Sequence, residues 1–212
     1  MRKFPNIELG DLQLCNRDTI CNAIVDNCPK VGALIVEIGV FRGKTLQGLC
    51  QLLQTEGFTE WKALGIDLDR GPWRFNCEEV LEKLGGYPVE IDTSGSPHAL
   101  RNNSWLCREE SINFLHIDGC HSQACVTQDF VVAETLIAIG GIVAFHDADT
   151  HCQGPEFDIQ PHCGAGCEVR KALHCLGLLN NTRPGWHLLA ALEGEPSGPR
   201  HGRGSVIVQK SS

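Results

Sequence analysis

The feature that most constrains the fold is an alternation of short, wholly apolar runs with longer segments that carry one apolar face. The runs at 33–38, 63–66 and 142–145 have the length and continuous hydrophobicity of strands buried on both faces of a parallel sheet. The segments 44–55 and 123–139 repeat their apolar residues at helical spacing. This alternation predicts an α/β fold in which helices cover both faces of a mostly parallel sheet.

The remaining segments complete a Rossmann-like, doubly wound sheet of seven strands that ends in an antiparallel hairpin. Further strands are expected at 89–91, 112–117, 186–192 and 205–208, and further helices at 16–28, 75–84 and 168–178. We expect Gly140 and Gly141 to end the helix that begins near 123, because glycine commonly follows the last turn of a helix.

The charge balance restricts the partners of the chain. Its formal net charge is −8, and it has no run of lysine and arginine, which argues against binding to nucleic-acid phosphates. The first residues lack the apolar stretch of a signal peptide, and no stretch approaches the length that crosses a bilayer. We therefore expect a soluble, cytoplasmic protein that binds neither nucleic acid nor membrane.

Twelve cysteines are scattered along the chain without a CxxC motif. In a chain of this length they are expected to be mostly buried free thiols rather than a disulfide framework. The His- and Cys-rich stretch 151–175 could hold a structural zinc ion, but its spacing matches no standard zinc motif, so the sequence leaves that question open.

The ends of the first two strands suggest a nucleoside-bearing ligand. In open α/β sheets ligands bind beyond the carboxyl ends of the strands. Gly39 and Gly43 flank the turn after the first strand and allow a ligand close to the backbone, while Asp67 ends the second, where a carboxylate can hold ribose hydroxyls. The GxGxxG motif of nicotinamide dehydrogenases is absent from this turn. Each feature alone also fits an ordinary tight turn or a solvated acid.

Acids and histidines follow two later strands. Asp118 and His121 come after the run at 112–117, and His146 and Asp147 come after 142–145. If these strands are neighbours, all four side chains reach the same crevice. Carboxylates together with imidazole suit a hard or borderline divalent ion and leave positions open for substrate oxygens.

Together these motifs resemble the class I S-adenosylmethionine-dependent methyltransferases. The resemblance is closest to the macrolide-sugar O-methyltransferases, with the catechol and caffeoyl-coenzyme-A O-methyltransferases as more distant metal-dependent relatives. It covers roughly residues 33–178. The matching motifs are Glu37-x-Gly39-x-x-x-Gly43, Gly65-Ile66-Asp67, His116-Ile117-Asp118-Gly119-x-His121-Ser122 and Gly140-Gly141-x-x-x-x-His146-Asp147.

The resemblance implies a role for each matching position. Glu37, Gly39 and Gly43 would line the methionine end of S-adenosylmethionine, Asp67 would hold its ribose, and Ser96 would lie near its adenine. Asp118 would serve the cofactor and, with Asp147, a divalent metal ion, magnesium or manganese. His146 would be a third metal ligand or would support one, and His121 would be the catalytic general base.

The resemblance further implies that residues 1–212 form one methyltransferase domain. A helical cap over 1–32 would precede a cofactor-binding core over 33–178 and C-terminal strands over 179–212. The expected reaction is O-methylation of a small-molecule hydroxyl. Two positions depart from the relatives: Ala148 replaces the metal-binding amide of the catechol type, and His146 replaces an acid of the macrolide type.

Two alternatives therefore stay open: a methyltransferase-fold binding protein that is catalytically silent or independent of metal, and another enzyme that uses a nucleotide cofactor. The acceptor and the oligomeric state, a homo-oligomer included, also stay open.

Overall fold

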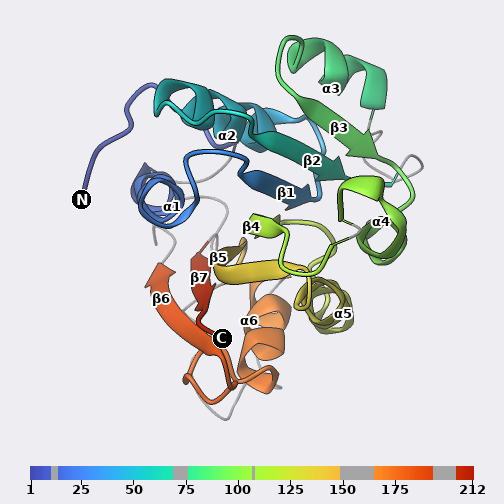
Figure 1. The fold of residues 1–212 in the computed structure, drawn as a ribbon. Coiled ribbons are helices and arrows are strands. Elements are labelled where there is room, and N and C mark those ends of the chain that lie inside the picture. The colour runs from blue at the N-terminus through green and yellow to red at the C-terminus, as the bar shows by residue number, and fades with distance from the viewer. Residues whose placement is uncertain (11–13, 69–75, 107, 149–164, 193–203) are drawn as a thin grey trace.

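The computed structural model describes residues 1–10, 14–68, 76–106, 108–148, 165–192 and 204–212. Within this part of the chain, strands form one seven-stranded sheet in the order β3-β2-β1-β4-β5-β7-β6 (Figure 1). The strands are β1 (Leu34–Ile38), β2 (Lys62–Ile66), β3 (Val89–Asp92), β4 (Ile112–Ile117), β5 (Ile137–Phe145), β6 (Trp186–Leu192) and β7 (Ser205–Lys210).

Neighbouring strands from β3 to β5 are parallel, and β7 is antiparallel to both β5 and β6. The predicted mostly parallel sheet with an antiparallel C-terminal hairpin is therefore confirmed.

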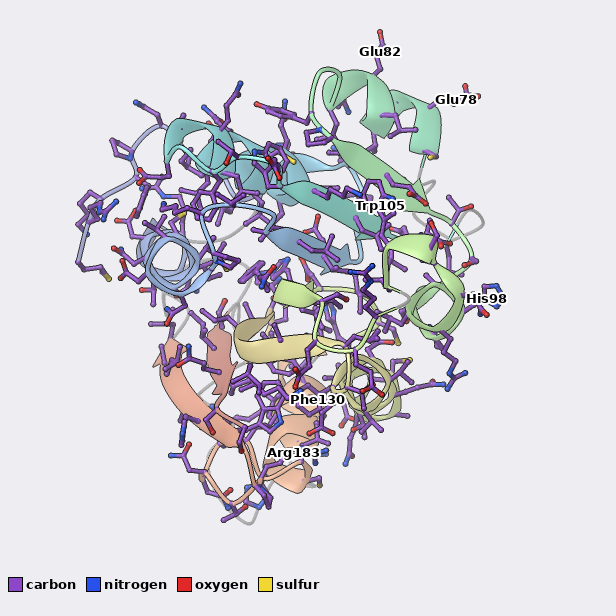
Figure 2. All side chains as sticks on the ribbon, in the orientation of Figure 1. Glu78, Glu82, His98, Trp105, Phe130 and Arg183 are labelled. Carbon is purple, nitrogen blue, oxygen red and sulfur yellow. The ribbon has the colours of Figure 1, made fainter. Side chains whose placement is uncertain are left out.

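Helices cover both faces of this sheet (Figure 1). They are α1 (Leu14–Asn27), α2 (Lys44–Thr55), α3 (Cys77–Lys83), α4 (Ser96–Asn102), the short 3-10 helix η1 (Ser104–Leu106), α5 (Gln123–Ala133) and α6 (Ala165–Cys175). Side chains of α1, α2 and α3 share one buried apolar cluster with the sheet, and those of α4, α5 and α6 share the other. Figure 2 shows Glu78 and Glu82 pointing from α3 away from the sheet, and Phe130 and Arg183 beside each other near α5. No helix among the described residues is both long and apolar enough to cross a membrane.

The boundary between α5 and β5 differs from the sequence prediction. The helix was expected to continue to Ile139, but α5 ends at Ala133, and β5 begins at Ile137 rather than at Ile142. Gly140 and Gly141 therefore lie inside the strand instead of ending the helix.

A bulge explains this difference. Ile112 of β4 pairs with Ile137, but Phe114 pairs with Ile142, so β5 carries extra residues between these two pairs. Gly140 has a φ of +80°, and a Cβ on Gly141 would lie 2.9 Å from the carbonyl oxygen of Ile112. The two glycines thus permit a bulge that other residues would obstruct, and glycine in a strand often marks such a bulge.

The strand register aligns the carboxyl ends of the four central parallel strands. Ile38 of β1 pairs with both Ile66 of β2 and Ile117 of β4, and Ile117 pairs with Phe145 of β5. The residues that follow these four positions are therefore level with one another along one edge of the sheet.

Candidate functional site

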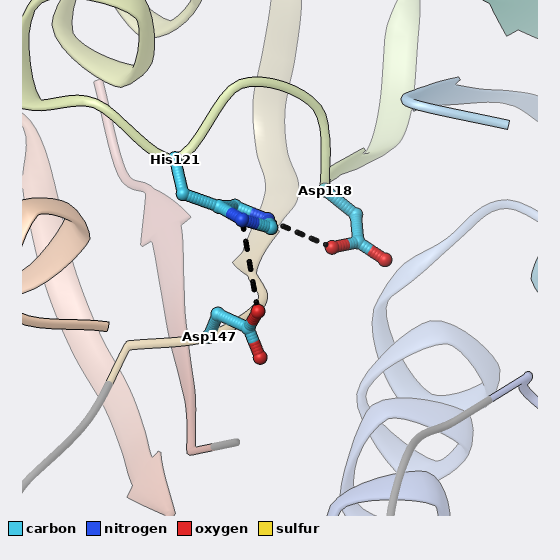
Figure 3. Close-up of side chains that lie close together, drawn as sticks. All are labelled: Asp118, His121 and Asp147. Carbon is cyan, nitrogen blue, oxygen red and sulfur yellow. Dashed lines mark hydrogen bonds and ion pairs between the residues drawn. The ribbon is translucent and has the colours of Figure 1, made fainter. Parts of the chain in front are cut away.

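Two acids and two histidines meet beyond the carboxyl ends of β4 and β5. Asp118 Oδ1 lies 2.8 Å from His146 Nδ1 and 3.2 Å from His121 Nε2. His121 Nδ1 lies 3.7 Å from Asp147 Oδ2, so the His121 ring stands between the two carboxylates (Figure 3). His146 Nδ1 is also 3.5 Å from Asp147 Oδ1. The structure thus brings together the four residues that the sequence predicted for this crevice.

The backbone on each side holds these residues in place. Ser122 caps α5 by accepting a hydrogen bond from the Cys125 amide at 3.3 Å, which starts the helix directly after His121. Asp147 has a φ of +52°, a left-handed conformation that aspartate tolerates better than most residues. The next amide, of Ala148, donates to the Gly204 carbonyl at 2.9 Å, and the Ala148 side chain is buried in the core rather than at the cluster.

The charges of the cluster depend on one another. Burial by itself raises the pKa of Asp118, but hydrogen bonds from His121 and His146 outweigh it and hold that pKa below its usual value. The pKa of His121 is raised, chiefly by its hydrogen bond to Asp118, with burial acting against the increase and the charge of Asp147 adding to it. The interactions favour an Asp118 carboxylate that stays charged.

The donor atoms fit a divalent metal ion. Asp118, His121 and Asp147 each offer an atom, and these atoms all lie within 4.8 Å of one another. Two ligand atoms that lie at right angles around one ion, each about 2.1 Å from it, are about 3.0 Å apart. This is close to the 3.2 Å between Asp118 Oδ1 and His121 Nε2. Asp147 Oδ1 is buried and makes no hydrogen bond among the described residues, although His146 Nδ1 lies 3.5 Å from it. A buried carboxylate oxygen in that position suits a metal ligand.

A glycine turn and an acid lie on the neighbouring strands of the same edge. Gly39 has a φ of +89°, and a Cβ there would lie 2.3 Å from the Asp118 carbonyl oxygen, so only glycine lets β1 and β4 end so close together. Asp67 accepts hydrogen bonds from the Phe41 amide at 2.7 Å and the Leu68 amide at 2.6 Å. Since a carboxylate can accept about four hydrogen bonds, half-buried Asp67 keeps acceptor capacity for a ribose. Gly43 caps α2 with a φ of +74°.

Glu37 lies in the interior below this turn. Its side chain is 1% exposed, and its Oε1 accepts a hydrogen bond at 3.0 Å from Nδ1 of His116, which is also 1% exposed. Burial raises the pKa of Glu37, and His116 acts against that increase. The sequence motif contained His116, but no role was predicted for it. The available signal was a glutamate and a histidine within two mostly apolar strands.

Ser96 opens α4 and donates a hydrogen bond to Asp129 of α5. Asp129 is buried, and burial raises its pKa to about 6, with the Ser96 hydrogen bond acting against the increase. The resemblance implies that Ser96 lies near the adenine, and it assigns no role to Asp129. In the structure Ser96 joins the two helices that follow β3 and β4.

Most of the residues proposed for a structural zinc site lie outside the part of the chain that the structure describes. This applies to His151, Cys152, His162 and Cys163, and to the side chain of Cys167. The described end of that stretch contains Cys175, which is exposed and accepts a hydrogen bond from Gln123 Nε2 at 3.4 Å.

An open groove of about 620 Å³ lies at the opposite edge of the sheet. It is lined by residues that precede β2 and β3, among them Trp61, Tyr87 and Pro88, with the Trp61 and Tyr87 rings 6.0 Å apart. The predicted site residues are not part of its lining.

Comparison with protein families identifies a methyltransferase match. Residues 36–148, just over half of the chain, match a family model described as a methyltransferase domain. This region begins within β1, ends just after β5 and includes every predicted site residue. No curated protein matches the chain.

Solved structures match over nearly the whole chain at low sequence identity. The O-methyltransferase TomG from Streptomyces achromogenes, involved in tomaymycin synthesis and solved with SAM, is 16% identical, with a TM-score of 0.68; the match covers 99% of this chain and 84% of that one. An O-methyltransferase from Bacillus cereus in complex with SAH is 14% identical, with a TM-score of 0.66 and coverage of 97% and 85%. The SAH-bound Podospora anserina methyltransferase PaMTH1 is 14% identical, with a TM-score of 0.62 and coverage of 95% and 80%. At these identities the matches establish a shared fold.

Proposed function

This chain belongs to the methyltransferase-domain family, and from that premise we propose that it methylates a hydroxyl group of a small molecule, with S-adenosylmethionine as methyl donor and a divalent metal ion assisting. Two of the similar structures are described as O-methyltransferases, which favours oxygen as the acceptor atom. The observation that carries the proposal is the cluster of Asp118, His121 and Asp147, level with the Gly39 turn and Asp67 on one edge of the sheet.

The chain offers a place for each reactant. We assign the ribose of the donor to Asp67 and its methionine end to the turn from Gly39 to Gly43, with Glu37 beneath it. When bound, S-adenosylmethionine supplies a methyl group on a positively charged sulfur. Asp118 and Asp147 would hold a divalent ion, which would supply positive charge to stabilise a developing oxyanion. Positioning of the reactants can lower the barrier by about 7–11 kcal/mol.

His121 takes the proton in this proposal. An alcohol or phenol is a poor nucleophile while protonated, since even a phenol has a pKa of about 10. In the reaction an oxygen–carbon bond forms as the carbon–sulfur bond breaks, and the hydroxyl proton leaves to a His121 ring nitrogen. His146 holds Asp118 by their 2.8 Å hydrogen bond, or serves as a further ligand. These acids also favour cationic ligands over anionic ones.

The test measures formation of S-adenosylhomocysteine from S-adenosylmethionine with a panel of catechol, phenol and sugar acceptors. We expect acceptor-dependent turnover that excess chelator abolishes and added magnesium or manganese restores, while calorimetry shows S-adenosylhomocysteine binding nearly unchanged by the chelator. Full turnover in excess chelator would refute the metal. Binding of S-adenosylhomocysteine without turnover on any acceptor would favour the catalytically silent alternative, and binding of NAD instead would favour another class of enzyme.

A further inference from the structure

Glu37 and His116 form a polar pair buried in the sheet beneath the candidate site. They face each other across β1 and β4, where their Cα positions are paired in register, and each side chain is 1% exposed. The hydrogen bond between them uses one atom of each. Glu37 Oε2 and His116 Nε2 are buried without a hydrogen-bond partner among the described residues. One carboxylate oxygen of Glu37 and one ring nitrogen of His116 are therefore unused within that part of the structure.

The stability of the fold does not require a polar pair at these two positions. Their neighbours along the same strands, Ile35 and Phe114, are fully buried apolar residues of the cluster that α1 and α2 cover. Replacing a buried ionic or hydrogen-bonded pair with apolar side chains of similar volume is often neutral or stabilising, whereas removing one partner alone is strongly destabilising. Because a pair of this kind is not required for stability, its position below the candidate site calls for a functional explanation.

A series of contacts leads from the pair to the candidate metal site. The His116 and His146 rings lie 6.1 Å apart between centroids and are inclined by 52°, within the range of aromatic contacts. His146 Nδ1 in turn contacts Asp118 Oδ1 at 2.8 Å. The glycine turn is held by different contacts, namely the Phe41 amide on Asp67 and the Gly39 amide on the Ile66 carbonyl. The contacts of the pair therefore lead toward the acids rather than toward the turn.

We infer that Glu37 and His116 are positioning residues for the candidate metal site. Glu37 fixes the His116 ring, which packs against His146 and so sets how His146 holds Asp118. This inference rests on the proposed function, because it requires a metal ion at Asp118 and Asp147. It changes the role of Glu37 from cofactor contact to support of the metal site.

Three variants separate this role from a structural one. Glu37→Gln keeps an oxygen that accepts from His116 Nδ1. His116→Asn keeps a donor toward Glu37 but removes the ring that contacts His146. Glu37→Leu with His116→Leu removes the whole pair without leaving a buried polar atom unpaired. Asn103→Leu is the control, since Asn103 is a buried polar residue that contacts Glu90 and Asp92 of β3, which β2 and β1 separate from β4 in the sheet.

The measurements are calorimetric dissociation constants for Mn²⁺ alone and for S-adenosylhomocysteine, the electron paramagnetic resonance spectrum of bound Mn²⁺, and the thermal midpoint. We expect the double variant and His116→Asn to weaken Mn²⁺ binding by at least tenfold and to alter the spectrum, with S-adenosylhomocysteine affinity within threefold of wild type. The double variant should unfold no earlier than wild type. Glu37→Gln should bind Mn²⁺ nearly as wild type does, and Asn103→Leu should change only the midpoint.

The opposite results are equally distinct. Wild-type Mn²⁺ affinity in a folded double variant and in His116→Asn would overturn the inference alone. A loss of S-adenosylhomocysteine affinity with unchanged Mn²⁺ affinity would also overturn it and return Glu37 to the cofactor. Absence of Mn²⁺ binding in the wild-type protein would defeat the metal in the proposed function, and this inference with it. If the double variant does not fold, His116→Asn and Glu37→Gln still decide the question.

Discussion

His121 is the residue whose position most directly affects the proposed chemistry, since its ring faces both carboxylates of the cluster (Figure 3). We predict that His121→Ala lowers kcat by about 100-fold or more, in line with the usual loss of a general base. Affinity for S-adenosylhomocysteine should not change. The measurement is steady-state turnover on an acceptor found in the panel, with exposed His98→Ala as the matched control.

A second measurement on the same variant distinguishes two roles. Unchanged Mn²⁺ affinity in His121→Ala would support the general base, whereas its loss would make His121 a metal ligand, as its place among the donor atoms allows. A variant that turns over within a few-fold of wild type would exclude both roles and shift attention to His146.

Asp67 gives the residue-scale test of the cofactor position. We predict that Asp67→Ala weakens S-adenosylhomocysteine binding at least tenfold, or about 1.4 kcal/mol. The variant loses the ribose acceptor and also the hydrogen bond that holds the Phe41 amide in the glycine turn. Gly39→Val should have an effect at least as large, and its folding needs a separate check because of the contact with Asp118. Calorimetry decides, with Glu82→Ala on the exposed side of α3 as control; undiminished affinity in both variants would place the cofactor elsewhere.

At the scale of elements, the contact between α4 and α5 through Ser96 and Asp129 is sensitive to pH. Burial raises the pKa of Asp129 to about 6, above the ordinary value of 3.8 for an aspartate. The pKa of Asp129 is therefore higher in the folded chain than in the unfolded chain. The stability that the protonated Asp129 carboxyl contributes is fully present below pH 3.8 and is lost as the pH rises through about 6. Two pKa units correspond to roughly 2–3 kcal/mol of unfolding free energy.

We therefore predict that Asp129→Asn, which still accepts from Ser96 but does not ionise, gains stability relative to wild type between pH 4 and pH 7.5. The expected gain is roughly 2–3 kcal/mol. Urea unfolding at several pH values measures it, and Asp26→Asn on the exposed surface of α1 controls for the general effect of removing a charge. A difference between Asp129→Asn and wild type that does not vary with pH would show that Asp129 ionises as freely in the folded chain as in the unfolded one.

At the scale of the whole molecule, periodicity was sufficient to predict the sheet because buried parallel strands read as continuous apolar runs. Periodicity was insufficient where the same residues are compatible with two different backbone structures. Gly140 and Gly141 fit a helix end as well as a bulge, and only pairing with β4 decides between them. The helix α4 was missed altogether: it is a short helix with Pro97 in its first turn, and short helices give little periodic signal.

The positions of the candidate site residues were predictable where they follow strands, whereas the contacts of residues within strands and helices were not. Asp67, Asp118, His121, His146 and Asp147 end or follow apolar runs, and the register then brings the strand ends level. Glu37, His116 and Asp129 depend on partners from another strand or helix, which sequence spacing cannot reveal.

The position of β7 has a consequence for how this protein is made. β7 inserts between β5 and β6 although it follows both in the chain, so a ribosome delivers β5 long before its neighbour. At about 5–20 residues per second, synthesis of the stretch 146–204 takes on the order of 3–12 s. During this time the backbone N–H and C=O groups that β5 later pairs with β7 are accessible to chaperones or to other nascent chains. The Gly204 carbonyl that fixes the turn after Asp147 arrives in the same late segment. A nascent chain that has all its motifs outside the ribosome thus still lacks the support that holds one of its two acids, and the site is completed only after β7 emerges.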